Sequence, residues 1–265
     1  MTLIEEHFNL HQPPFPQAAE ASALLHHQSL KEALERLRFA LVRDGIALVS
    51  AESGCGKSTL LGCLCRELDP TEYLVVYSSL SSLNPFSLLS SLSTKIGLRS
   101  RRFKGETAIE LLTHLRTLPK RTLIILDEAH LLPDKSLEDL RLLTADCLDK
   151  QSPFALILAG QPLLRERLTE PHHYSLEQRI TVRVRLRPLT DGEVALFLDK
   201  HLRSCGAQRV LFDPDAVTLL FQHTRGIPRR IQNLALDAML AAACGNKKTV
   251  DADCVQQAVL DQEAP

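Results

Sequence analysis

Long apolar runs are missing from this sequence: its 265 residues hold no uninterrupted apolar stretch long enough to cross a bilayer. The first residues, Met-Thr-Leu-Ile-Glu-Glu-His, also lack the basic-then-apolar order of a secretory signal peptide. A large charge excess is missing too, because the formal net charge is −1. Any nucleic-acid binding must therefore come from a local patch. We expect a cytoplasmic protein without membrane insertion.

Metal-binding cysteine pairs are likewise missing. The seven cysteines show no C-x-x-C spacing, and their odd number favours free thiols. Cys55 lies in a glycine-rich turn, where a redox role is less favoured than a bystander thiol. The histidine doublets at 26–27 and 172–173 have no partners at metal-ligand spacing, so we expect both at the surface. Internal repeats and low-complexity segments are also lacking.

The sequence is organised around residues 46–61, where an apolar run is followed by a small-residue turn and then by helix formers. Glycines at such a turn let backbone N–H groups surround phosphates at a helix N-terminus. Lys57 would reach the β- and γ-phosphate oxygens, and the Ser58 hydroxyl would bind Mg²⁺. Ala51 replaces the first glycine of the G-x-x-x-x-G-K-[ST] pattern. A glycine-rich turn with a surface lysine is the less favoured alternative. The residues expected to contact ATP here are Ser53, Gly54, Cys55, Gly56, Lys57, Ser58 and Thr59.

Two further apolar runs end in polar side chains. Residues 121–126 are typical of a strand buried on both faces of a parallel sheet. Asp127 follows them and would hold Mg²⁺ through water, while Glu128 would polarise the attacking water. Gln161 follows the apolar run 154–160 and could sense the γ-phosphate. A turn residue that caps the next helix is an equally good interpretation of Gln161.

Arginines later in the chain are candidates for contacts with the γ-phosphate. Residues 177–187 alternate apolar residues with arginine, which predicts an edge-like strand with one cationic face. Arg179 precedes the alternation and could act as an arginine finger on a neighbouring subunit's nucleotide. A plain surface arginine is the alternative. Near the start of a later helix, Arg229 or Arg230 could reach back to the γ-phosphate.

A basic loop at residues 99–105 is the candidate DNA contact. Its four basic side chains would pair with phosphates of the DNA backbone, and such contacts weaken as the salt concentration rises. A solvated basic loop is the favoured alternative. The candidate DNA-binding residues are Arg99, Arg101, Arg102 and Lys104.

The remaining patterns predict an α/β fold with a parallel sheet flanked by helices, followed by a small helical lid. Residues 7–27 are proline-rich, with Phe8 and Phe15 as expected anchors. Pro188 marks the boundary between a phosphate-loop core, residues 1–187, and the lid, residues 188–265. A strand is expected at 73–77. Helices are expected at 29–41, 57–68, 85–96, 106–118, 136–149, 191–203, 213–223, 228–243 and 251–261.

With these motifs assembled, the sequence resembles the AAA+ ATPases of the ExeA-like group. That group contains ExeA-type secretion ATPases and the TniB, TnsC and MuB transposition regulators. The resemblance covers nearly the whole chain. It is carried by Phe8 with Pro13-Pro14-Phe15 and by residues 52–58, 126–129, 140–143, 160–165, 178–181, 186–189 and 226–229. It implies Walker A at Lys57 and Ser58, Walker B at Asp127 and Glu128, sensor 1 at Gln161, the arginine finger at Arg179 and sensor 2 at Arg229.

The resemblance implies an ATPase that uses ATP and Mg²⁺, with active sites between subunits of a ring or filament. The sequence shows neither the membrane helix nor the wall-binding module of full secretion ATPases. We therefore expect a transposition regulator that assembles on double-stranded DNA and recruits a transposase. A secretion or envelope-associated ATPase is the alternative, and a non-catalytic adaptor is disfavoured. Asp127-Glu-Ala-His130 also spells a helicase box, but no second RecA-like domain follows, and His130 is then an ordinary residue.

Overall fold

A computed structural model describes residues 2–16, 28–79, 84–145 and 152–263. The chain divides into two compact units. The sheet unit comprises residues 28–53 and 57–186, and the helical unit comprises residues 1–27, 54–56 and 187–265. Each unit has its own apolar core.

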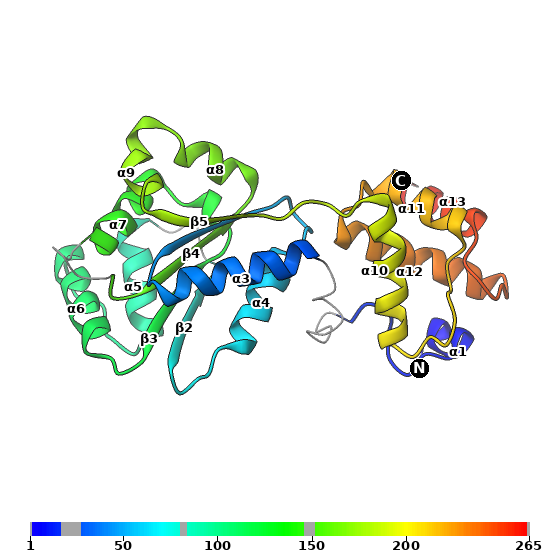
Figure 1. Cartoon of the computed structure of the whole chain (residues 1–265), viewed down its shortest axis with the longest axis horizontal. Helices are drawn as coiled ribbons and strands as arrows, with labels where there is room; N and C mark the ends of the chain where they lie inside the picture. The colour runs from blue at the N-terminus through cyan, green and yellow to red at the C-terminus, as the bar shows by residue number, and fades with distance from the viewer. Residues whose placement is uncertain (1, 17–27, 80–83, 146–151, 264–265) are drawn as a thin grey trace. The chain divides into compact units, whose positions relative to one another are not determined.

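The sheet unit is built on a five-stranded parallel sheet with the strand order β2-β3-β4-β1-β5 (Figure 1). The strands are β1 Ile46–Ser50, β2 Tyr73–Ser78, β3 Arg121–Leu126, β4 Ala155–Gly160 and β5 Ile180–Arg185. Every residue of β1 and β4 is buried, as expected for inner strands covered on both faces. In β5, buried and exposed residues alternate, because β5 is an edge strand. The predicted parallel α/β fold is confirmed.

Helices cover both faces of this sheet. They are α3 Gln28–Val42, α4 Lys57–Glu67, α5 Pro85–Lys95, α6 Lys104–Thr117, α7 Asp134–Ala145, α8 Pro162–Leu168 and α9 Tyr174–Glu177. Leucines of α5, α6 and α7 pack against alternate strand residues such as Leu48, Ile124 and Leu156, which share one face. Helices α3 and α4 pack together, and α3 lies against β5 and β1. Helix α9 was not predicted, and α8 was implied only as the helix that Gln161 would cap. Residues 146–149 of the helix expected at 136–149 lie outside the described residues.

The helical unit contains α1 Leu3–Phe8, α10 Asp191–Ser204, α11 Pro214–Thr224, α12 Pro228–Cys244 and α13 Ala252–Glu263. Phe8 and Phe15 are buried, as predicted for anchors, together with Leu10. Their partners, however, are residues of α10–α13 rather than the sheet. The sequence had grouped this N-terminal segment with the phosphate-loop core, whereas its apolar side chains complete the core of the helical unit. The last segment of this unit starts at Arg187, one residue before Pro188, and the division into core and lid at Pro188 stays a prediction.

Gly226 is a position where only glycine fits. Its φ is +73°, and a Cβ placed there would lie 2.0 Å from the carbonyl oxygen of Leu189. The Leu189 N–H donates to the Gly226 oxygen at 2.8 Å, so the two segments cannot separate without losing this bond. We expect Gly226→Ala to destabilise the helical unit by about 3 kcal/mol or more.

Urea unfolding followed by circular dichroism measures this effect. Gly192→Ala is the matched control, because Gly192 belongs to α10 of the same unit and a Cβ placed there would meet nothing within 4 Å. That substitution should change stability by no more than about 1 kcal/mol, in the stabilising direction. Equal unfolding midpoints for the two variants would contradict the conclusion that only glycine fits at position 226.

Neither a membrane-spanning helix nor a disulfide occurs in the described part of the chain. None of its helices is both long and apolar enough to cross a bilayer. The cysteines found there, Cys55, Cys63, Cys65, Cys205, Cys244 and Cys254, all carry free thiols. Cys55 is buried within the glycine-rich turn.

Candidate nucleotide site

The loop between β1 and α4 has the backbone of a phosphate-binding turn. Gly54 and Gly56 have φ values of +82° and +90°, which L-residues rarely adopt. Ala51 is not among the residues with positive φ, so its methyl group causes no strain. The departure from the glycine pattern at Ala51 therefore does not disturb the loop. Helix α4 begins at Lys57, and its first N–H groups end the turn.

Lys57 lies inside the loop that it follows. Its side chain is buried, and Nζ donates to the carbonyl oxygens of Ala51 at 3.0 Å and Glu52 at 3.4 Å. An ammonium group has three donors, so Nζ keeps capacity for an oxyanion held by the loop. Ser58 is exposed in the first turn of α4, where the helix dipole favours negative charge.

Three neighbouring strands bring the predicted motifs to one edge of the sheet (Figure 1). Strand β4 lies between β1 and β3, and Ser50 pairs with Gly160. Leu126 pairs with Leu158, two residues before Gly160. Since neighbouring strands are about 4.8 Å apart, the ends of β1 and β3 are separated by about 10 Å. The phosphate loop, Gln161 and the acidic pair therefore share this edge, which is where open α/β sheets bind ligands.

Asp127 is held in place by its neighbours. It is 4% exposed, and its carboxylate accepts bonds from the Tyr77 hydroxyl at 3.0 Å and from the Glu128 N–H at 2.9 Å. Burial, followed by the bond to Asp127, raises the pKa of Tyr77 to about 12. The phenol therefore keeps its proton, and remains a hydrogen-bond donor, at neutral pH. Sequence reasoning missed Tyr77, whose position depends on the β2–β3 register.

Glu128 has a left-handed backbone, with φ +52° and ψ +32°, directly before the 3₁₀ turn η1 Ala129–Leu131. Such a conformation is uncommon for a non-glycine residue and is enriched at functional sites. Its Oε2 lies 3.5 Å from Nδ1 of His130, which is buried. The N–H of Gln161 lies 3.4 Å from the same Nδ1. His130, which the sequence analysis treated as an ordinary residue, therefore lies beside both the Glu128 carboxylate and the Gln161 backbone.

Gln161 occupies the N-cap position of α8, but its side chain makes no capping hydrogen bond. The side-chain amide therefore does not cap the helix, as the alternative interpretation of Gln161 required. Its position at the end of β4 suits contact with a phosphate held by the neighbouring loop. The sensor role of Gln161 stays a prediction.

Arg179 lies at the amino-terminal ends of the strands, opposite the end that carries the phosphate loop. It is exposed directly before β5, and Ile180 pairs with Ile46 at the start of β1. A strand of five residues at about 3.3 Å each places Arg179 some 16 Å from the loop that follows Ser50. Its guanidinium lies 3.5 Å from the carbonyl oxygen of Thr144. This placement is compatible with a finger directed at another subunit and not with one directed at its own loop.

Arg229 lies in the first turn of α12, with Pro228 at the first helical position. Its N–H donates to the Gly54 carbonyl oxygen at 3.3 Å, and both residues belong to the helical unit. A Cβ on Gly54 would lie 2.9 Å from the Arg229 Cβ. Glycine is thus required at position 54 for space as well as for φ. The sensor role of Arg229 stays a prediction.

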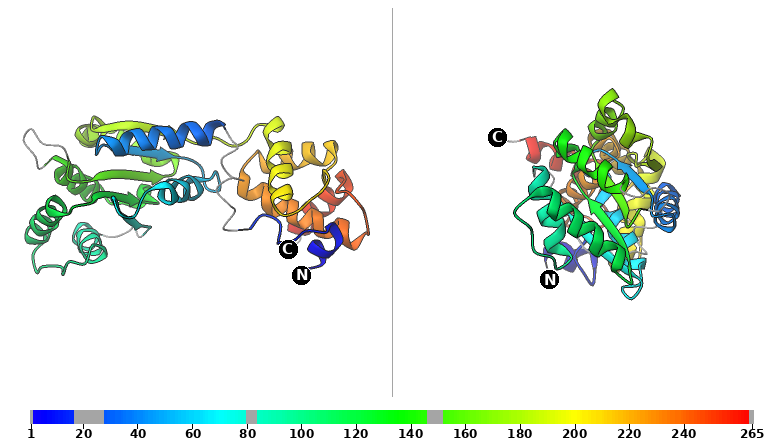
Figure 2. Two further views of the ribbon diagram at one scale, coloured as in Figure 1. Left: turned by 60° about the horizontal axis from the view of Figure 1, so that its bottom comes forward. Right: turned by 90° about the vertical axis from the view of Figure 1, so that its left-hand side faces the viewer.

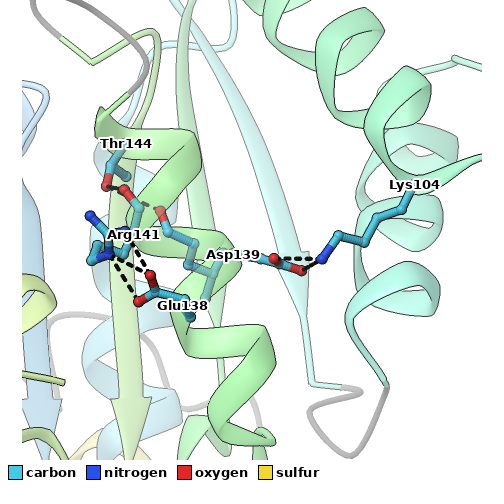
Figure 3. A network of polar contacts seen from close by, with 6 residues as sticks. Lys104, Glu138, Asp139, Arg141 and Thr144 are labelled. Carbon is cyan, nitrogen blue, oxygen red and sulfur yellow. Dashed lines mark hydrogen bonds and ion pairs between the residues drawn. The ribbon is translucent and has the colours of Figure 1, made fainter. Parts of the chain in front are cut away.

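The basic loop is partly neutralised by acidic residues of neighbouring helices. Arg101 forms a two-pronged ion pair with Glu110, at 2.6 and 2.8 Å. Lys104, which begins α6, reaches both oxygens of Asp139 on α7, at 2.7 and 2.8 Å (Figure 3). The Arg102 guanidinium lies over the Phe103 ring. Two of the four predicted DNA contacts therefore have carboxylate partners within the protein, and the DNA-binding role stays a prediction.

The expectation that both residues of the second histidine doublet lie at the surface is wrong for His173, which is 2% exposed. His173 Nε2 lies 3.0 Å from Asp134 Oδ1, and His172 lies beside the same carboxylate. The Arg167 guanidinium also donates to Asp134 and, with His173, lowers the pKa of that carboxyl group. Because a guanidinium already neutralises Asp134, this cluster is an ion-pair network rather than a metal site. Residues 26–27 lie outside the described residues.

Comparison with known proteins gives two sequence matches. Residues 40–168 match the family model for the AAA domain. Over 255 residues, the chain is 34% identical to General secretion pathway protein A of Aeromonas hydrophila. The match covers 93% of this chain and 46% of that protein, so the chain spans about half the length of its curated relative.

Solved structures with a similar fold include CDC6P from Pyrobaculum aerophilum, with a TM-score of 0.67 and 16% identity over 97% of this chain and 70% of that one. The Aeropyrum pernix ORC1 protein in complex with DNA gives a TM-score of 0.65 and 20% identity, covering 98% and 69%. The Thermotoga maritima RuvB Holliday junction branch migration motor gives 0.61 and 18%, covering 90% and 70%. At these identities the likeness shows the fold alone.

Proposed function

We propose that this chain, whose residues 40–168 match the family model for the AAA domain, binds Mg-ATP and hydrolyses it to ADP and phosphate. The observation that carries the proposal is the shared sheet edge of β1, β4 and β3. There a turn with two left-handed glycines stands beside a buried aspartate and a backbone-strained glutamate. Both the phosphate cradle and the acidic pair that hydrolysis requires are present in this chain.

Each residue has a defined task in this reaction. The N–H groups of residues 53–59 and the Lys57 ammonium hold the phosphates. Ser58 and the buried Asp127 offer the oxygen ligands that Mg²⁺ prefers, and the ion would neutralise charge on the β- and γ-phosphates. Glu128 orients a water molecule and accepts its proton as the water oxygen bonds to the γ-phosphorus. The bond from the γ-phosphorus to the β-γ bridging oxygen breaks, and ADP leaves.

The pathway that the similarity favours is the secretion-type alternative, not transposition regulation. The 34% identity to General secretion pathway protein A extends over almost the whole chain. The expectation of a transposition regulator was based on the absence of a membrane helix and a wall-binding module from this sequence. That argument carries no weight, because the match covers less than half of the relative. We propose that the chain is the ATPase part of an envelope-associated secretion system.

Assembly into a ring or filament and action on the cytoplasmic side, where ATP is available, belong to the same proposal. The position of Arg179, far from the phosphate loop of its own chain, supports an active site that a second subunit completes. Double-stranded DNA and a transposase are partners in the less favoured transposition hypothesis. The ion pairs of Arg101 and Lys104 weaken that hypothesis further.

The test is steady-state ATP turnover by the purified chain with magnesium, with and without duplex DNA. We expect turnover without DNA and no change when DNA is added at about 50 or about 200 mM salt. ATP-dependent DNA binding that weakens steeply between these salt concentrations would instead restore the transposition hypothesis. If folded protein showed neither ATP turnover nor calorimetric binding of Mg-ATP, the ATPase proposal itself would be wrong.

A further inference from the structure

A cationic hollow lies in the sheet unit, and none of its lining residues belongs to the phosphate loop at 51–56. It has a volume of about 340 Å³, at the lower end of the range for small-molecule pockets. Its lining residues belong to α3, α8, the inner strand β1 and the edge strand β5. The lining residues are Ser29, Glu32, Ala33, Arg36, Leu48, Ser50, Arg165, Arg183, Val184 and Arg185.

Four of these lining residues are arginines, and Glu32 is the one acidic residue among them. Arg183 is turned toward the start of β5, where it pairs with Glu177. Within the described part of the chain, Arg165 and Arg185 form no ion pair with any carboxylate. The hollow therefore keeps a positive charge that the surrounding protein does not neutralise.

The strand register explains why these arginines meet. In β5 two of the three exposed positions of the alternating pattern carry arginine, Arg183 and Arg185, and Arg185 pairs with Ser50 at the end of β1. Helix α3 runs alongside β5 (Figure 2). Arg36 on α3 donates to the Arg183 carbonyl oxygen at 3.4 Å. Helix α8 directly follows β4, the strand on the other side of β1, and contributes Arg165. Three separate elements thus direct cationic residues at one small space.

We propose that this hollow binds a phosphate dianion, either as inorganic phosphate or as the phosphate of a small monoester. Guanidinium groups present parallel donors that match phosphate oxygens, and they form such bonds more readily than ammonium groups do. Bound phosphate relieves the mutual repulsion of the arginines. The small volume and the buried walls at Ala33 and Leu48 favour a small ligand over a macromolecule. The proposal does not depend on ATP hydrolysis at the phosphate loop.

The test is isothermal titration of the Lys57→Ala chain with inorganic phosphate, and separately with AMP, at low salt. The Lys57→Ala background weakens phosphate binding at the loop, and the arginine variants below change only the hollow, so failure of the ATPase proposal and failure of this one are distinguishable. We expect Arg185→Gln or Arg165→Gln to weaken binding about tenfold through loss of a charged hydrogen bond. Glu32→Gln should tighten it severalfold, an effect that misfolding cannot imitate.

Arg141→Gln is the matched control, because Arg141 is an arginine of the same unit that pairs with Glu138 and lies outside the hollow (Figure 3). It should leave phosphate affinity unchanged. Binding of both probes supports a phosphate subsite, and binding of AMP alone assigns the monoester as the ligand. No binding of either probe would overturn the proposal. So would equal affinity in the wild-type, Arg185→Gln and Glu32→Gln hollows.

Discussion

Glu128→Gln is expected to lower ATP turnover by about 10² to 10⁴-fold while ATP binding is retained. The amide keeps the size and hydrogen-bonding reach of the side chain but cannot accept the proton of the attacking water. Lys57, Ser58 and Asp127 are untouched, so the phosphates and the metal keep their ligands. The variant should therefore stay in its ATP-bound state.

Turnover by phosphate release and affinity by a fluorescent ATP analogue measure the two effects separately. Glu166→Gln is the control, because Glu166 is an exposed glutamate of α8, in the same unit. It should show wild-type turnover. If Glu128→Gln turned over at the wild-type rate, Glu128 would lose its role as the base.

Mixing two inactive variants should restore activity if Arg179 acts on a neighbouring subunit. Lys57→Ala chains lack the phosphate contact, and Arg179→Ala chains should lose about 10³-fold or more of turnover. In an equal mixture, half of the sites carry Lys57 and half of the neighbouring subunits supply Arg179. About a quarter of the sites, one half times one half, should then be complete.

The control mixture combines Lys57→Ala with Glu128→Gln. Both residues serve the same chain's site, so no arrangement of these subunits makes a complete one, and turnover should stay at background. Recovery in this control would show that the assay does not report subunit complementation. Turnover that stayed at background at every ratio of Lys57→Ala to Arg179→Ala would exclude a finger in trans.

Much of the sheet unit was predictable because its signals are local. The runs before Ala51 and Asp127 are short, apolar and bounded, and a parallel strand buried on both faces has that pattern. The N-terminal segment was misplaced for the opposite reason. Phe8, Leu10 and Phe15 are too few and too irregular to show a period, so only the packing reveals that α10–α13 receive them.

The residues that surround the candidate site could not be found from the sequence. Tyr77 reaches Asp127 across 50 residues, and His173 reaches Asp134 across 39. Both contacts depend on strand register and on turns that a single sequence does not specify. His130 is only two residues from Glu128 in the chain, but its importance comes from the proximity of Gln161, which follows β4.

The Nδ1 atom of His130 can hold a proton or a lone pair, but not both at once. With a proton it donates to Glu128, and with a lone pair it accepts from the Gln161 N–H. The two partners therefore compete for one atom, and the position of the ring proton decides which of them the ring restrains. The partner that the ring does not hold is the Gln161 N–H when Nδ1 carries the proton, and the Glu128 carboxylate when it does not.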